Sequence, residues 1–203
     1  MKRIFDIGFS IFAIILFFPL FVIIYLLIFL LERTNPIFIQ ERPGLNGEKF
    51  KVYKFKTMYD NSDEILEKFL ESHPKAKEEW NKYKKLKTYD PRVTPIGKFL
   101  RKTSLDELPQ FINVLKGDMS IVGPRPYILK EFEEHNITKE IMDKIFSVKP
   151  GITGLWQVSS RNEATFEERL QQDLEYIYKQ SFWLDLKIIL KTIKVMITGK
   201  GAY

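Results

Sequence analysis

The chain has no cysteine and only two histidines, His73 and His135, among its 203 residues. Without thiols it can form neither a disulfide framework nor a thiolate zinc site. Two histidines are also a poor supply for a histidine-rich metal centre or a histidine-based catalytic triad. Any metal ion would therefore be held by oxygen ligands, which favours a hard cation such as Mg²⁺.

Charge is absent from residues 7–31, which read IGFSIFAIILFFPLFVIIYLLIFLL. A helix of this length covers roughly 37 Å at about 1.5 Å per residue, enough to cross a hydrocarbon core of about 30 Å. The run is too long for the core of a signal peptide, and no small-residue cleavage motif follows it. We therefore interpret it as a retained membrane segment.

Pro19 lies near the middle of this run and predicts a kink. Two topologies are open: a kinked helix that crosses the bilayer, and a re-entrant helix-break-helix that enters and leaves on one face. The positive-inside rule favours the cytoplasm both for the rest of the chain and for Lys2 and Arg3, which argues for re-entry. We expect a membrane-embedded helix-break-helix at 1–34 and a cytoplasmic domain at 35–203.

We predict an α+β fold that is mostly helical and contains a small β-hairpin. Residues 37–40 and 50–58 are its expected strands, because Asn46-Gly47 between them is a strong turn signal. Residues 61–88 are highly charged, and their apolar residues recur at helical spacing. Since Pro74 divides this segment, we expect a helical insert of two pieces.

Residues 181–198 predict an amphipathic helix that begins near Trp183. Such a helix either lies in the membrane interface or packs against the domain core. Its expected basic face consists of Lys187, Lys191 and Lys194, and its expected apolar face of Leu186, Ile189, Leu190, Ile193 and Ile197.

The stretch TSLDELPQ places two carboxylates, Asp106 and Glu107, side by side. Ser104 and Glu107 match a capping box, although a helix capped at Ser104 would hold Pro109 where a backbone donor is needed. A start nearer Asp106 would place Pro109 in the first turn. Either start puts both carboxylates at a positive helix end, which favours their ionised forms. An ionised aspartate can attack phosphorus where cations neutralise the phosphate.

Cations are in excess, with 32 basic and 26 acidic residues and a net charge of +6. This balance suits anionic partners without choosing between phosphates, nucleic acid and lipid headgroups. Arginine in a rigid turn can grip a phosphate with two parallel hydrogen bonds, and we expect four arginines in or near turns that contain proline or glycine: Arg42, Arg101, Arg125 and Arg161. The predicted phosphate-binding residues are Arg42, Lys54, Arg101, Arg125 and Arg161. Because these cations cluster around carboxylates, we disfavour nucleic acid as the partner.

Four stretches occur in the order QERPG, KFKTM, LRKTSLDELPQFINVLKGDMSIVGPRP and PGITGLWQVSSRN. Together they resemble the bacterial sugar transferases, the small monotopic phosphoglycosyl transferases. The segment YDPRVTPIGKFLRKTSLDELPQ and the terminal GAY are most similar to the polyprenyl-phosphate hexose-1-phosphate transferase branch, which starts O-antigen, capsule or exopolysaccharide synthesis. Many members of that branch carry further transmembrane helices and another domain, and this chain resembles their catalytic portion.

The resemblance implies transfer of a sugar 1-phosphate from a UDP-sugar to polyprenyl (undecaprenyl) phosphate, on the cytoplasmic face of the bacterial inner membrane. Asp106 would attack the sugar-bearing phosphate, release UMP and carry the phosphosugar until the lipid phosphate captures it. Glu107 would hold Mg²⁺. Lys54, Arg101 and Arg125 match family positions near the phosphates, and Arg161 matches the arginine of the Gln-Val-x-x-Arg-Asn motif. Glucose or galactose is the expected sugar, and a homodimer stays open.

The family's re-entrant helix breaks at a proline that Pro19 matches, but Phe18 stands where many members have serine. Trp156 either stacks on uracil or packs in the core. Two other mechanisms stay open. In one, the chain is a membrane-tethered module that binds anionic lipid without catalysis. In the other, the lipid phosphate attacks directly and Asp106 acts only electrostatically.

Overall fold

The computed structural model describes residues 1–83, 86, 89–159 and 164–198, and within them helices dominate over two small sheets. This confirms the predicted mostly helical chain with little β-structure. In chain order the elements are α1 (Lys2–Glu32), β1 (Ile37–Pro43), η1 (Leu45–Gly47), β2 (Lys49–Phe55), α2 (Ser62–Ser72), α3 (Pro74–Tyr83), α4 (Pro95–Thr103), η2 (Leu105–Glu107), α5 (Gln110–Lys116), β3 (Ser120–Val122), α6 (Leu129–Glu134), α7 (Lys139–Ile145), β4 (Gly151–Thr153), η3 (Trp156–Val158), α8 (Phe166–Lys179) and α9 (Phe182–Thr198).

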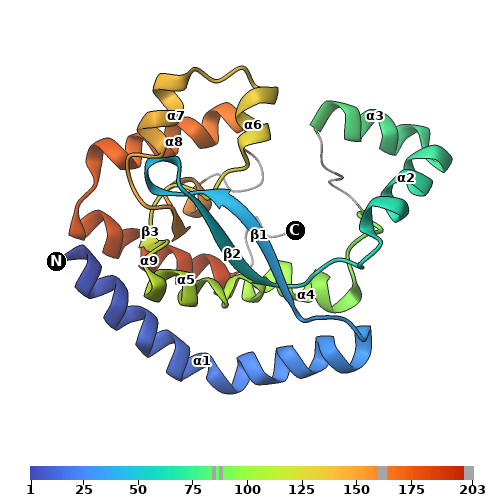
Figure 1. Ribbon diagram of the computed structural model, residues 1–203, viewed down its shortest axis with the longest axis horizontal. Coiled ribbons are helices and arrows are strands. Elements are labelled where there is room, and N and C mark those ends of the chain that lie inside the picture. Colours follow the sequence, from blue (N-terminus) through green and yellow to red (C-terminus); the bar gives the residue numbers. More distant parts are fainter. Residues whose placement is uncertain (84–85, 87–88, 160–163, 199–203) are drawn as a thin grey trace.

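The predicted hairpin is present and crosses the front of the molecule as β1 and β2 (Figure 1). Its strands are antiparallel, with Ile37 opposite Phe55 and Pro43 opposite Lys49. Asn46 and Gly47 have φ angles of 56° and 77°, the left-handed conformation that these two residue types tolerate best. The turn chemistry thus sets the register that brings Lys54 towards the middle of the molecule.

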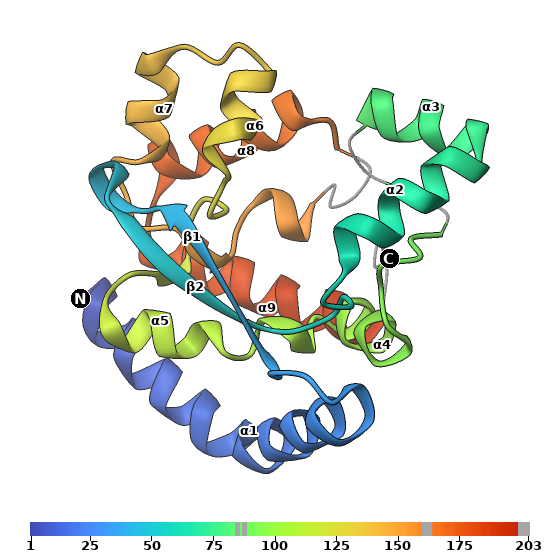
Figure 2. The ribbon, with the colours of Figure 1, turned by 45° about the vertical axis from the view of Figure 1, so that its right-hand side comes forward.

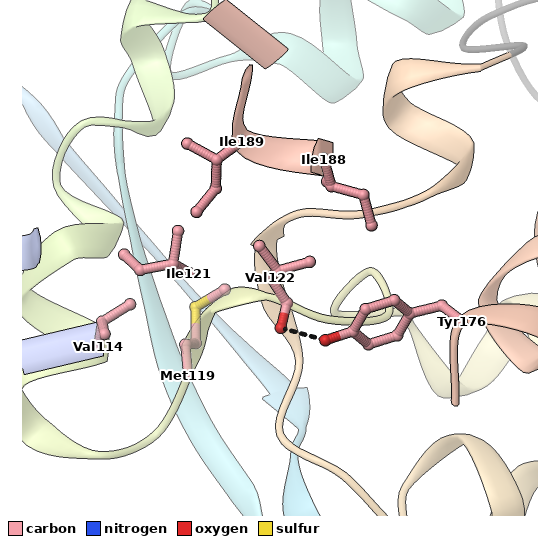
Figure 3. Packing of buried hydrophobic residues seen from close by; sticks show 7 residues of the cluster. All are labelled: Val114, Met119, Ile121, Val122, Tyr176, Ile188 and Ile189. Atoms are coloured by element: carbon pink, nitrogen blue, oxygen red, sulfur yellow. Dashed lines mark hydrogen bonds between the residues drawn. The ribbon is translucent and has the colours of Figure 1, made fainter. Parts of the chain in front are cut away.

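Strands β3 and β4 form a parallel pair with only three residues each, and they sit inside the main hydrophobic core. Figure 3 shows this core, in which residues of α5, β3, α8 and α9 meet. The Tyr176 hydroxyl donates its one proton to Asp185 Oδ1 at 2.7 Å and also lies 3.1 Å from the Val122 carbonyl oxygen, which ties β3, α8 and α9 together. The buried members are Val114, Met119, Ile121, Val122, Tyr176, Ile188 and Ile189.

Helix α1 is a continuous helix that contains Pro19 and bends as it runs below α5 (Figures 1 and 2). The predicted break therefore takes the form of a bend, and re-entry stays a prediction. Among the helices of the described residues, α1 alone is long and apolar enough to cross a membrane. It exposes many large apolar side chains along its length, including Phe12, Ile15 and Phe18.

Both ends of α1 are fixed to the folded domain. At the first turns, Asp6 accepts hydrogen bonds from the Ser120 hydroxyl at 2.8 Å and from the Ile121 amide at 3.1 Å. Near its other end, Ile28 is fully buried in a cluster that includes Phe55 of β2 and Leu100 of α4. The exposed apolar stretch thus lies between two anchored ends.

Helices α2 and α3 form the predicted two-piece insert, with Pro74 as the first residue of α3, and they project away from the rest of the molecule (Figures 1 and 2). Proline suits a first helical position because its missing amide needs no partner there. Trp80 lies on α3, and the Arg92 guanidinium stacks on its ring at 4.9 Å from the centroid.

Helix α9 packs one face against the core and leaves the other face exposed. Its face with Asp185, Ile188 and Ile189 is buried against the core. The predicted division into basic and apolar faces is wrong in detail, because Ile189 is buried whereas Leu190 and Ile193 are exposed. An open groove along the outer face is lined by Trp183, Leu186, Lys187, Leu190, Lys191 and Lys194. That mixed surface is suited to a membrane interface, which stays a prediction.

Candidate active site

Asp106 and Glu107 lie in η2, the short turn between α4 and α5. Ser104 ends α4 in the left-handed conformation with φ 58°, and its amide bonds back to the Arg101 carbonyl. Pro109 is the N-cap of α5. The capping-box alternative is excluded, because the Ser104 side chain makes no capping bond and the Glu107 carboxylate instead pairs with Lys54. Because the backbone leaves α-helical geometry at Ser104, both carboxylates lie outside a regular α-helix.

Glu107 pairs with Lys54 of β2, whose Nζ lies 2.7 Å from Glu107 Oε1. The two side chains are 26% and 28% exposed, so the pair sits at a partly solvated surface. Gln110, at the start of α5, also donates to the Glu107 carboxylate. The structure thus brings together two of the predicted site residues that are 53 positions apart.

The two adjacent carboxylates differ in acidity. Burial, and then the negative charge of Glu107, raises the pKa of Asp106 to about 6. Burial also opposes ionisation of Glu107, but the neighbouring Lys54 ammonium and the Arg125 guanidinium outweigh it and lower the pKa of Glu107. At neutral pH both groups are ionised, and Asp106 is the more basic of the two.

Arg101 approaches the pair from α4. It lies in the last turn of that helix and not in a loop, which corrects the predicted setting, and its Nε donates to Thr57 Oγ1 at 2.9 Å. Its positive charge opposes the rise in the pKa of Asp106. Gly97 allows α4 to pack this closely, because a Cβ there would lie 2.1 Å from the Thr57 carbonyl oxygen.

A small cleft joins Glu107 to two further predicted residues, Arg42 and Arg125. It holds about 20 Å³, room for roughly one water molecule. Arg42 belongs to strand β1 and not to a turn, so that part of the prediction is wrong. The cleft is lined by Phe38, Gln40, Arg42, Val52, Lys54, Glu107, Gln110, Arg125, Pro126, Gly151, Ile152 and Gln157. The remaining predicted cation, Arg161, lies outside the described residues.

Asp173 of α8 holds the segment that carries Arg125. Its Oδ2 accepts the Arg125 amide at 3.1 Å and the Tyr127 hydroxyl at 2.8 Å. Burial raises the pKa of Asp173 to about 7, although both hydrogen bonds oppose that rise. Asp173 was not among the predicted site residues. The sequence nevertheless contains a signal for it, because Asp173 lies on the same buried face of α8 as Phe166 and Leu170. A carboxylate on such a face needs hydrogen-bond partners.

Trp156 is 5% exposed, and two guanidinium groups lie over its ring. The Arg125 Cζ is 5.7 Å and the Arg169 Cζ is 5.5 Å from the ring centroid. This environment favours the packing alternative over stacking on a nucleobase. Arg169 was not among the predicted residues.

The described residues contain no group of three or more histidine, cysteine, aspartate or glutamate side chains that could hold a metal by themselves. Mg²⁺, however, is often bound by one or two carboxylates together with substrate phosphates. Asp106 and Glu107 offer such a pair, and the repulsion between them would be relieved by a cation. The donor set therefore fits Mg²⁺ in the presence of a phosphate substrate.

Comparison with known proteins gives a consistent result. The family described as bacterial sugar transferase matches residues 1–199. Over its whole length the chain is 47% identical to a UDP-galactose-lipid carrier transferase of Erwinia amylovora and 46% identical to an undecaprenyl-phosphate galactose phosphotransferase of Salmonella typhimurium, and it spans 42% of each. It is 42% identical to the exopolysaccharide production protein ExoY of Sinorhizobium fredii, of which it spans 88%. The chain belongs to the bacterial sugar transferase family.

Proposed function

We propose that this chain transfers a sugar 1-phosphate from a UDP-sugar to polyprenyl phosphate, with Asp106 as the nucleophile. The observation that carries the proposal is that two adjacent carboxylates have pKa values shifted in opposite directions, upwards for Asp106 and downwards for Glu107. The cations that act on them are Lys54, Arg101 and Arg125. The names of the relatives supply the substrate class, because they specify a UDP-sugar donor and an undecaprenyl phosphate acceptor.

In the first step, an Asp106 carboxylate oxygen attacks the β-phosphorus of the donor. A bond forms from that oxygen to phosphorus, the bond from phosphorus to the bridging oxygen breaks, and its electron pair leaves with UMP. In the second step, an oxygen of the lipid phosphate attacks the same phosphorus and returns the electron pair to Asp106. Asp106 suits this exchange because its raised pKa makes it the more basic carboxylate of the pair.

Lys54 and Arg101 neutralise the phosphate that Asp106 attacks, since both already act electrostatically on Asp106. Glu107 would hold Mg²⁺, which when bound neutralises charge on the diphosphate. The cleft has room for roughly one water in this conformation, so it must widen to admit a nucleotide sugar.

The anchoring of α1 supports a position for this chemistry at the membrane surface, where a lipid phosphate lies. Both ends of α1 contact the same domain, through Asp6 at one end and Ile28 at the other. A helix anchored in this way enters and leaves the bilayer on one face, with its exposed apolar middle in the hydrocarbon. We place the domain at the cytoplasmic face of the inner membrane, with the outer face of α9 against the headgroups.

The test is to incubate detergent-solubilised protein with Mg²⁺, undecaprenyl phosphate and either UDP-galactose or UDP-glucose, and to measure UMP. We expect UMP release with at least one donor, and loss of release by a factor of at least about 10³ in Asp106→Asn or with EDTA. The matched control is Asp143→Asn, on α7 and outside the cleft. Protein that binds anionic liposomes equally well as wild type and as Asp106→Asn, and releases no UMP from a UDP-sugar panel, would instead be a membrane-tethered binding module.

A further inference from the structure

Arg42, Arg125 and Arg169 form a cluster of guanidinium groups beside the cleft, drawn from β1, from the segment after β3 and from α8. Arg42 and Arg125 line the cleft itself. Arg125 and Arg169 both lie within 6 Å of the centroid of Trp156, at 5.7 and 5.5 Å. Three elements far apart in sequence thus direct like charges to one place.

The described residues do not neutralise this cluster. None of them places a carboxylate within 4.0 Å of the three guanidinium groups, although Glu131 acts on Arg42 and Arg169 from farther away. Nη1 of Arg42 and Nε of Arg125 are buried without a hydrogen-bond partner in the described part of the chain. Buried donors without acceptors are costly, so an acceptor supplied from outside would stabilise them.

Mutual repulsion among the three arginines supports the same conclusion. Burial, and then the positive charge of Arg125, lowers the pKa of Arg42 to about 10. The same two causes lower the pKa of Arg169. An anion with several acceptor oxygens would relieve both the repulsion and the missing hydrogen bonds.

We infer that Arg42, Arg125 and Arg169 bind two phosphate monoesters in turn. These are the phosphate of UMP, which leaves in the first step, and the lipid phosphate, which attacks in the second. This inference rests on the proposed function. Lys54 and Arg101 act on Asp106, where the β-phosphate reacts. Arg125 acts on Glu107 but is not among the causes of the shift at Asp106, and it lines the cleft together with Lys54 and Arg42. The second anion of the donor is the α-phosphate, which lies one bridging oxygen from the reacting phosphorus.

The chemistry requires this site to serve both substrates. When the bond from the β-phosphorus to the bridging oxygen breaks, the electron pair adds negative charge to the α-phosphate, which departs as part of UMP. The lipid phosphate then forms a bond to the same phosphorus. Because the second step is the reverse of the first with lipid in place of nucleoside, the lipid phosphate takes the position that UMP vacated. Guanidinium groups in that position stabilise both transition states.

The test compares Arg169→Gln and Arg169→Lys with the matched control Arg92→Gln. Arg92 also stacks on a tryptophan, but it is paired with Asp90 in the projecting part of the molecule. Calorimetry would measure the Kd of UMP and of uridine for each full-length protein in detergent, with the thermal midpoint as a check on folding. We expect UMP binding to weaken about tenfold or more in Arg169→Gln, with partial recovery in Arg169→Lys and no change in uridine binding.

A second measurement separates the two phosphates. Wild-type and Arg169→Gln protein, loaded with sugar phosphate from the UDP-sugar, would be mixed with undecaprenyl phosphate, and the rate of capture followed. We expect capture to slow about tenfold in Arg169→Gln. Unchanged UMP affinity in folded Arg169→Gln would overturn the inference, and unchanged capture would overturn the shared use of the site. UMP binding needs no turnover, so absence of turnover in wild type would count against the proposed function and leave this result intact.

Discussion

Asp106 and Glu107 are chemically similar neighbours, yet their surroundings push their pKa values in opposite directions. Glu107 faces Lys54 directly, while Asp106 is dominated by burial and by the charge of Glu107. A pair divided in this way assigns two roles, because the more basic carboxylate is the better nucleophile and the more acidic one is the permanent anion. We therefore propose that Asp106 attacks and that Glu107 binds the cation.

This division predicts how the pKa of Asp106 responds to Glu107→Gln. Removing the negative neighbour removes one cause of the rise, so the pKa of Asp106 should fall from about 6 by on the order of one pH unit. The measurement is carboxyl ¹³C NMR of Mg²⁺-free protein, with Asp106→Asn to assign the resonance. In wild type the ionised form should be lost as pH falls through about 6. A wild-type midpoint near 4, unmoved by Glu107→Gln, would contradict the assignment.

Asp106, Glu107 and Lys54 could be predicted as candidates because motif order identifies them, whereas Arg169 could not. For Asp173 the apolar register of α8 indicates burial but not the partners. These two residues act through Trp156 and through the backbone amide of Arg125, contacts that no local pattern encodes.

Among the elements, those fixed by local chemistry were predictable. Asn46-Gly47 favours a hairpin turn, and Pro74 suits the first position of a helix, where α3 begins. The β3–β4 pair was not predictable, because each strand has three residues and its partner is about thirty positions away. The capping-box alternative is also excluded. Ser104 is both the C-cap of α4 and the first flanking residue of η2, and in its left-handed conformation its side chain makes no capping hydrogen bond.

Helix α1 gives a prediction at this scale. The chain has no cysteine, so single cysteines at Ile4 and Asn35 report the two ends of the helix without background. Because both ends are anchored to one domain, a membrane-impermeant thiol reagent should label both from the cytoplasmic side of inverted vesicles and neither from the other side.

Phe18→Cys is the control for that experiment. Phe18 is 60% exposed in the protein, so failure of the reagent to reach a cysteine there would show that lipid covers it. Labelling of Ile4→Cys and Asn35→Cys from opposite sides would mean that α1 spans the bilayer, against re-entry.

In the whole molecule, the cleft is built from β1, β2, η2 and the segment after β3. Arg42, Lys54, Glu107 and Arg125 meet there from four separate places in the chain. The sequence identified these four residues as candidates. Which of them contact one another depends on how β2 packs against η2 and on how α8 holds the segment with Arg125. The same fold leaves the apolar middle of α1 and the mixed basic and apolar outer face of α9 exposed.

The claim that Asp106 carries the phosphosugar is tested most directly by trapping it. Purified protein with Mg²⁺ and a UDP-sugar, but without polyprenyl phosphate, would be analysed by intact-protein and peptide mass spectrometry. We predict an added mass of one hexose phosphate on the peptide that contains Asp106, absent in Asp106→Asn and lost when undecaprenyl phosphate is added. Protein that turns over with both substrates yet never carries the adduct would show that the lipid phosphate attacks the donor directly.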